Sequence, residues 1–215
     1  MTEKKCLLLF SGGRDSTVSA VYLASQYDYL NLITIKSEHL VGAKNVYKRL
    51  EELKPILKDK CTWEFYQKME SIKVQHLKPT TCLPCHAYYI ALMQNIAISN
   101  NIQNVSLGYV GYQNCWEEQT EYAKLSLKKY FEEIGLNLLL PVENIKEKEE
   151  IKRELKKNGL SEKSLEQKCL KATYNLHLKV SEIEEQINIW ISEIKRLSVI
   201  LKENYKSTQI DKVNL

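Results

Sequence analysis

Long apolar runs, glycine and proline are all scarce in this chain of 215 residues. The seven glycines and four prolines are too few for a long flexible linker or a low-complexity segment. No stretch reaches the about eighteen consecutive apolar residues that a membrane-spanning helix needs, so no membrane partner is expected. Residues 1–5 lead directly into a strand-like run, and no secretory signal is visible there. We therefore expect a cytoplasmic protein.

An excess of one charge is also lacking. The 31 Lys and Arg residues against 27 Asp and Glu residues give a formal net charge of +4. The two signs are interleaved, as in KEKEEIKRELKK at residues 146–157, which is typical of a solvated helix face and not of a nucleic-acid-binding stripe. The six cysteines, in a chain without a secretory signal, favour metal-binding, catalytic or buried thiols over disulfides.

Apolar runs that suit buried strands alternate along the chain with helical patterns. Strands are predicted at residues 5–10, 29–35, 62–66, 104–108 and 136–142. Helices are predicted at residues 14–26, 41–58, 84–100, 117–134 and 147–158. This alternation predicts an α/β fold with a doubly wound, mostly parallel, five-stranded sheet and helices on both of its faces.

The C-terminal residues differ from the rest of the chain. Their apolar side chains recur at spacings of three and four, at Val180, Ile183, Ile187, Trp190, Ile194, Leu197 and Leu201. This spacing predicts a long amphipathic helix over residues 181–205, which either lies against its own domain or joins two chains as a homodimer. We accordingly divide the chain into an α/β domain at residues 1–175 and a C-terminal helical extension at residues 176–215.

The turn between the first predicted strand and helix reads SGGRDST. Gly12 and Gly13 would let backbone N–H groups approach an anion closely, and Ser11, Ser16 and Thr17 add hydroxyls at the start of the helix. The lysine of the common phosphate loop G-x-x-x-x-G-K-[ST] is absent, and the second and third glycines of the Rossmann fingerprint are missing. The turn therefore predicts a phosphate site of another kind.

This S-G-G-x-D-S turn resembles the loop of the PP-loop ATP pyrophosphatases, which have the adenine nucleotide α-hydrolase-like fold. The resemblance implies that the turn grips the two terminal phosphates of ATP and leaves the α-phosphorus open to attack by a substrate oxygen. Asp15 is then expected to hold the Mg²⁺ that neutralises the departing pyrophosphate. Gly108, which ends a predicted strand, is expected beside the nucleotide.

Two further segments, residues 106–125 and 138–151, resemble the 7-cyano-7-deazaguanine synthases of queuosine biosynthesis. The matching residues, which the resemblance places at the substrate, are Tyr112, Cys115 and Glu118. The synthases have aspartate and arginine where this chain has Asn114 and Trp116. These two departures leave the identity of the substrate open.

The resemblance implies a C–N ligase that converts ATP to AMP and pyrophosphate. ATP would activate a carboxylate on a 7-deazapurine-like substrate, and ammonia or another amine donor would then displace AMP. Lys148 would counter the charge that develops near the α-phosphate. Two alternatives stay open: ATP-dependent sulfur transfer to tRNA, in which Cys82 or Cys85 carries a persulfide or anchors a cluster, and a nucleotide-binding regulator without turnover.

Cys82 and Cys85 form the one C-x-x-C pair of the sequence. Two thiolates at this spacing bind Zn²⁺ readily, and a tetrahedral site needs two more ligands. Cys169, which corresponds to the first cysteine of the zinc site of the synthases, is the expected third ligand. The fourth is expected to be Cys115, with His86 as the alternative. A reactive thiol pair and inert buried thiols remain the other interpretations.

Overall fold

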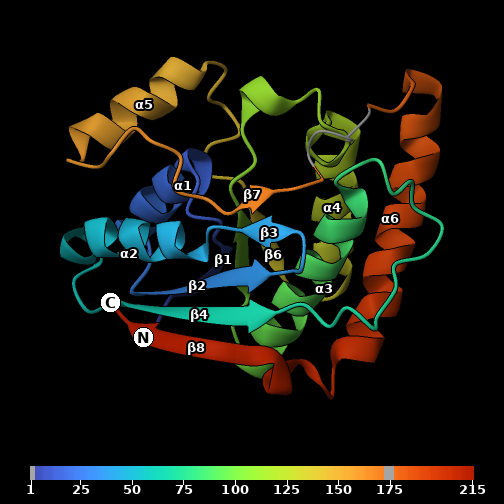
Figure 1. Cartoon of the computed structure of the whole chain (residues 1–215), viewed down its shortest axis with the longest axis horizontal. Coiled ribbons are helices and arrows are strands. Elements are labelled where there is room, and N and C mark those ends of the chain that lie inside the picture. The colour runs from blue at the N-terminus through green and yellow to red at the C-terminus, as the bar shows by residue number, and fades with distance from the viewer. Residues whose placement is uncertain (1–2, 172–176) are drawn as a thin grey trace.

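The computed structural model describes residues 3–171 and 177–215, and these residues form a layered α/β structure (Figure 1). The strands are β1 (Lys5–Leu9), β2 (Tyr29–Lys36), β4 (Cys61–Gln67), β5 (Asn104–Leu107), β6 (Asn137–Leu139) and β8 (Gln209–Asn214). They form one sheet in the order β6-β5-β1-β2-β4-β8. The first five strands in this order run parallel, as predicted, and β8 is an additional strand antiparallel to β4.

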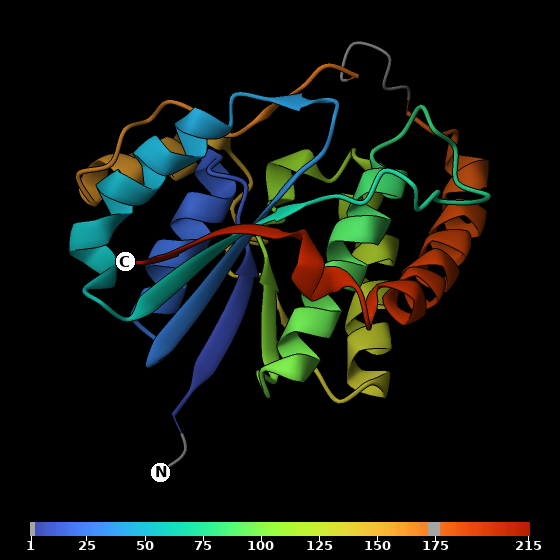
Figure 2. The ribbon, with the colours of Figure 1, turned by 60° about the horizontal axis from the view of Figure 1, so that its bottom comes forward.

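Helices cover both faces of the sheet (Figures 1 and 2). One face carries α1 (Arg14–Ala24), α2 (Ala43–Leu57) and α5 (Lys148–Lys157). The other carries α3 (Leu83–Ser99), α4 (Glu121–Glu133) and α6 (Val180–Leu201). The doubly wound arrangement that the alternating pattern predicted is thus confirmed, and each face has its own buried apolar cluster.

Two predicted helices differ from those in the structure. The helix predicted at residues 117–134 is divided, because Thr120 has extended backbone angles and its hydroxyl accepts a hydrogen bond from the Ala123 N–H at 3.3 Å, which caps α4. The residues before it form a separate 3₁₀ turn at Glu117–Gln119. The tail helix ends at Leu201, and the chain then continues through a 3₁₀ turn at Tyr205–Thr208 into β8.

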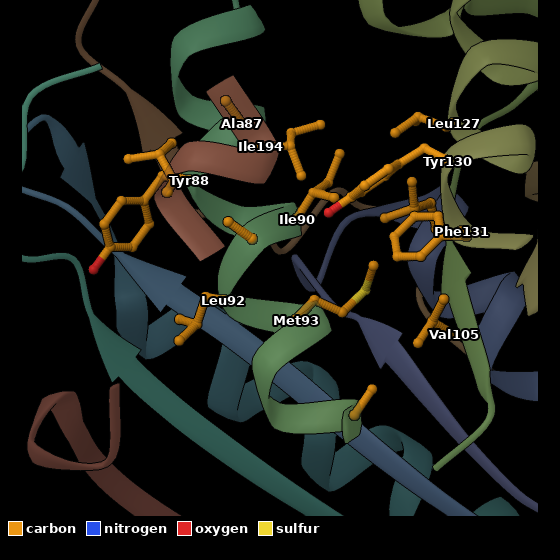
Figure 3. Packing of buried hydrophobic residues seen from close by; sticks show 14 of the residues in the cluster. Ala87, Tyr88, Ile90, Leu92, Met93, Val105, Leu127, Tyr130, Phe131 and Ile194 are labelled. Atoms are coloured by element: carbon orange, nitrogen blue, oxygen red, sulfur yellow. The ribbon is translucent and has the colours of Figure 1, made fainter. Parts of the chain in front are cut away.

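Helix α3 lies between the sheet and α6 and is apolar on all sides. Figure 3 shows Ile90 and Met93 of α3 near Tyr130 of α4 and Val105 of β5, with Ile194 of α6 close to the same cluster. A helix without a polar face requires a partner on both sides, and here the partners are the sheet and α6. The amphipathic tail helix therefore supplies a layer of the core.

The apolar seam of α6 is covered by its own chain. Its residues with no exposed surface are Ile187, Trp190, Ile194, Leu197 and Leu201. Of the two arrangements predicted for this helix, the structure thus has the one in which it lies against its own domain. The predicted boundary between residues 175 and 176 lies outside the described residues. In the part of the chain that is described, no helix is long and apolar enough to cross a membrane.

Candidate active site

A cavity of about 700 Å³ opens at the carboxyl ends of β1, β2 and β5. Ser11 follows β1, Ile35 comes from the end of β2, and Gly108 follows β5, and all three line the cavity. Parallel α/β sheets bind their ligands at this edge, where the strands end and the helices begin. The cavity is therefore the candidate site for a nucleotide.

The predicted phosphate turn forms one wall of this cavity. Ser11, Gly13, Asp15 and Ser16 line it. Gly13 is the N-terminal cap of α1 and provides no side-chain acceptor, so the first N–H groups of α1 remain for a ligand. The turn is held together by its own hydroxyls: Ser16 Oγ accepts a hydrogen bond from Ser11 N at 3.3 Å, and Ser11 Oγ accepts one from Gly13 N at 3.1 Å.

Two glycines permit close contacts around the turn. Gly12 has a left-handed φ of 78°, and a Cβ there would lie 2.9 Å from the carbonyl oxygen of Leu165. A Cβ on Gly108 would lie 2.9 Å from the backbone of Ser16. Gly108 thus allows β5 to approach the start of α1, and it lines the cavity.

Thr17 does not line the cavity. Its side chain is fully buried, and its hydroxyl donates to the Gly13 carbonyl at 2.5 Å. A threonine hydroxyl on a helix often bonds to the carbonyl one turn earlier. The binding of pyrophosphate by Thr17 stays a prediction.

Asp15 is held by residues from the loop after β5. Its Oδ1 accepts a hydrogen bond from the Tyr112 hydroxyl at 2.5 Å, and its Oδ2 accepts one from Gln113 Nε2 at 3.4 Å. Burial raises the pKa of Asp15, while the Tyr112 hydrogen bond and the positive charge of Lys148 act to lower it. Tyr112, predicted at the substrate, thus contacts the phosphate turn. Lys148 acts on that turn through its charge.

Glu166 is a further acidic residue at the turn, and the sequence analysis missed it. Its Oε2 lies 2.5 Å from the position that a Cβ on Gly13 would take, and its charge raises the pKa of Asp15. The side chain is exposed and accepts a hydrogen bond from Ser164 Oγ at 2.8 Å. No local motif marks this residue, because only the fold brings it to the turn.

Three cysteines reach the same cavity from two directions. Cys82 and Cys85 stand at the start of α3, and Cys169 lies on β7 (Lys168–Cys169), which pairs antiparallel with β3 (Leu40–Val41). All three line the cavity. The pKa of Cys82 is raised to about 12 by burial and by the negative charges of Glu118, Cys85 and Cys169. These four groups are therefore electrostatic neighbours.

The predicted zinc set is not assembled in the described residues. Cys115, the expected fourth ligand, is exposed and does not line the cavity, so it joins neither the other thiols nor the predicted substrate site. Across residues 3–171 and 177–215, no three His, Cys, Asp or Glu side chains are arranged to hold a single metal ion. His86, the alternative fourth ligand, bonds through Nδ1 to the Tyr109 hydroxyl at 2.9 Å. The structure instead places His39 Nε2 3.4 Å from Cys85 Sγ.

Glu118 is brought to the cavity by the 3₁₀ turn before α4. It is 4% exposed and lines the cavity, and its Oε2 has no hydrogen-bond partner among the described residues. The residues on either side are fixed: Glu117 Oε1 accepts from Leu178 N at 2.6 Å, and Gln119 Oε1 accepts from Val110 N at 3.0 Å. The residue predicted at the substrate therefore presents a buried carboxylate to a ligand.

Comparison with solved structures finds similar folds. A 4-thiouridine synthetase, solved as an RNA complex with bound ATP, matches with a TM-score of 0.69 and 17% identity over 94% of this chain and 54% of that one. The U34-tRNA thiolase NcsA from Methanococcus maripaludis, solved with its [4Fe-4S] cluster, matches with a TM-score of 0.55 and 17% identity over 94% and 72%. The chain thus spans about half the length of the synthetase. No family model matches the sequence, and no curated protein matches it.

Proposed function

Because the chain has the fold of the PP-loop ATP pyrophosphatases, we propose that it activates a carbonyl oxygen of uridine in RNA with ATP and replaces that oxygen with sulfur. The observation that carries this proposal is a single cavity lined by both the phosphate turn and three thiols, Cys82, Cys85 and Cys169. Activation and sulfur attack occur at atoms one bond apart, so both sets of residues must reach the same substrate. The names of the two compared proteins, a synthetase of 4-thiouridine and a tRNA thiolase, agree with this chemistry.

The phosphate turn would carry out the first half of the reaction. Backbone N–H groups at the start of α1, with the hydroxyls of Ser11 and Ser16, would bind the two terminal phosphates. The substrate oxygen attacks the α-phosphorus, a new P–O bond forms, and the bond to pyrophosphate breaks. Asp15 and Glu166 are the carboxylates that would hold Mg²⁺ beside the departing phosphates.

The three thiols suit an iron–sulfur cluster. Cluster irons are bound by cysteine thiolates, and Cys82, Cys85 and Cys169 line one cavity. Burial and the negative charge of Cys169 raise the pKa of Cys85, and the positive charges of Lys68 and Lys171 only partly oppose this. Cys82, Cys85 and Cys169 would hold such a cluster, and the cluster would supply the sulfur atom that replaces the activated oxygen.

A second candidate is the 7-cyano-7-deazaguanine synthase-like reaction, in which an amine displaces AMP from an activated carboxylate. The buried Glu118 carboxylate favours this candidate, because a deazapurine offers N–H donors that such a carboxylate could accept. Its other predicted substrate residues give less support, because Tyr112 bonds to Asp15 and Cys115 lies outside the cavity. Sulfur transfer uses every thiol that the cavity contains.

The test is a product analysis. The protein is reconstituted anaerobically with iron and sulfide and incubated with ATP, Mg²⁺, sulfide and unfractionated tRNA; AMP and thiolated nucleosides are then measured by mass spectrometry. We expect both in equal amounts, with thiolation lost in Cys82→Ser and retained in Cys115→Ser. AMP that depends on 7-carboxy-7-deazaguanine and ammonia would favour the second candidate. Formation of ADP, or no turnover with any substrate, would contradict both.

A further inference from the structure

The proposed function gives roles to the phosphate turn and to the thiols, but none to the buried carboxylate of Glu118. We propose that Glu118 accepts the ring N–H of the base that is activated and takes its proton as the neighbouring carbonyl oxygen attacks ATP. The site would thereby select bases in which an N–H stands beside a carbonyl. This inference rests on the proposed function, which it deepens.

Burial without a partner is the first observation behind this role. Glu118 is 4% exposed, and its Oε2 has no hydrogen-bond partner among the described residues. A buried carboxylate oxygen without a hydrogen bond lowers stability, because that oxygen loses hydration without replacement. A ligand that donates an N–H would supply the missing bond. The carboxylate lines the same cavity as the phosphate turn and acts on Cys82 through its charge.

The local backbone keeps this carboxylate available. Its two neighbours in the 3₁₀ turn are engaged by backbone N–H groups, Glu117 by Leu178 and Gln119 by Val110. The Gln119 Nε2 also donates to Gln113 Oε1 at 2.9 Å, and Gln113 donates to Asp15. The segment that carries Glu118 is thus connected through hydrogen bonds to the phosphate turn. The carboxylate and the phosphate turn therefore line one cavity and are joined by these hydrogen bonds.

The chemistry of a uracil ring requires such a group. When the carbonyl oxygen attacks the α-phosphorus, the ring becomes cationic unless the adjacent N–H loses its proton. Transfer of that proton to Glu118 gives a neutral ring with a C=N bond, while the new O–P bond forms and the bond to pyrophosphate breaks. The proton leaves Glu118 by exchange with solvent after product release. Cytosine has no hydrogen on this ring nitrogen, so its nitrogen lone pair would face the Glu118 carboxylate, and both groups are hydrogen-bond acceptors.

The test compares wild type with Glu118→Gln, which keeps the shape but cannot take a proton. With unfractionated tRNA as substrate, we expect kcat/KM for AMP formation to fall about 100-fold or more, as is typical for loss of a general base. The melting temperature should not fall, because the buried Oε2 of Glu118 has no hydrogen-bond partner among the described residues that the substitution could remove. Glu132→Gln, on the exposed surface of α4, is the control and should leave both quantities unchanged.

A binding measurement separates this inference from the proposed function. Wild type should bind uridine more tightly than 3-methyluridine, and Glu118→Gln should lose this preference. Equal binding of the two nucleosides by wild type, or wild-type turnover in Glu118→Gln, would overturn the role of Glu118. So would a parallel loss of activity and melting temperature in that variant, which indicates a structural role. Absence of AMP formation by wild type would count against the proposed function, and the nucleoside preference would still decide the role of Glu118.

Discussion

Gly13→Ala is a sharp perturbation of the phosphate turn, because the fold should tolerate it and a bound phosphate should not. Gly13 has φ −70° and ψ 172°, which alanine adopts without strain. The new Cβ would lie 2.5 Å from Glu166 Oε2 and 3.0 Å from Ser11 Oγ. Both are side-chain atoms, and the exposed Glu166 can move away. The methyl group would then occupy space at the N–H groups that are proposed to bind phosphate.

The expected loss of ATP affinity can be estimated from the hydrogen bonds that the phosphate would lose. A phosphate held back by the methyl group loses at least one hydrogen bond to a charged acceptor, worth roughly 1.5–3 kcal/mol. At about 1.4 kcal/mol for each factor of ten, the Kd for ATP should rise about 10- to 100-fold. The unfolding free energy should change little, since no backbone angle becomes strained.

The assay is calorimetric titration with a non-hydrolysable ATP analogue and Mg²⁺, combined with urea denaturation of the same samples. Gly135→Ala is the matched control: Gly135 has φ 76°, and no atom lies within 4 Å of the position that a Cβ would take there, so alanine should cost about 1 kcal/mol of stability and leave the affinity unchanged. Wild-type affinity in Gly13→Ala would refute the phosphate site. A loss of affinity that only accompanies unfolding would also refute this reasoning.

Three further results are expected. Cys169→Ser should lower the amount of iron bound after anaerobic reconstitution, measured by mass spectrometry, whereas Cys115→Ser should not. The reason is that Cys169 lines the cavity and Cys115 does not. Equal iron in both variants would contradict the thiol assignment. Ending the chain after Thr208 removes β8 and uncovers the edge of β4, so the melting temperature should fall and light scattering should rise. Burial raises the pKa of Glu193, but hydrogen bonds from Arg196 and a backbone N–H lower it more, so that the pKa lies below the ordinary glutamate value of 4.5. Its ionised form therefore stabilises the fold above that pH, and the difference in unfolding free energy between wild type and Glu193→Gln should shrink as the solution is acidified; a constant difference would exclude this contribution.

Most of the parallel sheet could be predicted because β1, β2, β4 and β5 are largely buried. Runs such as YLNLITIK, which forms β2, are apolar enough to be found without knowledge of their neighbours. Strand β8, with the sequence QIDKVN, alternates between exposed and half-buried residues at the sheet edge. Its strand conformation depends on pairing with β4, a partner far away in the sequence, so no local pattern indicates it.

The site was predictable to the extent that its residues are contiguous. The phosphate turn stands in one short segment, and its residues Ser11, Gly13 and Ser16 line the cavity. Thr17 belongs to the same segment, but its hydroxyl bonds within the helix. Cys169 was expected beside the C-x-x-C pair only from the family resemblance, because no periodicity indicates the short β3–β7 ribbon that carries it.

The most direct test of the proposed reaction is a crystal structure of the protein with Mg²⁺ and a non-hydrolysable ATP analogue. We predict that the two terminal phosphates bind the turn at residues 11–16 and that the α-phosphorus faces the part of the cavity lined by Cys82, Cys85 and Cys169. A triphosphate bound elsewhere, or an α-phosphorus that faces away from the three thiols, would contradict it.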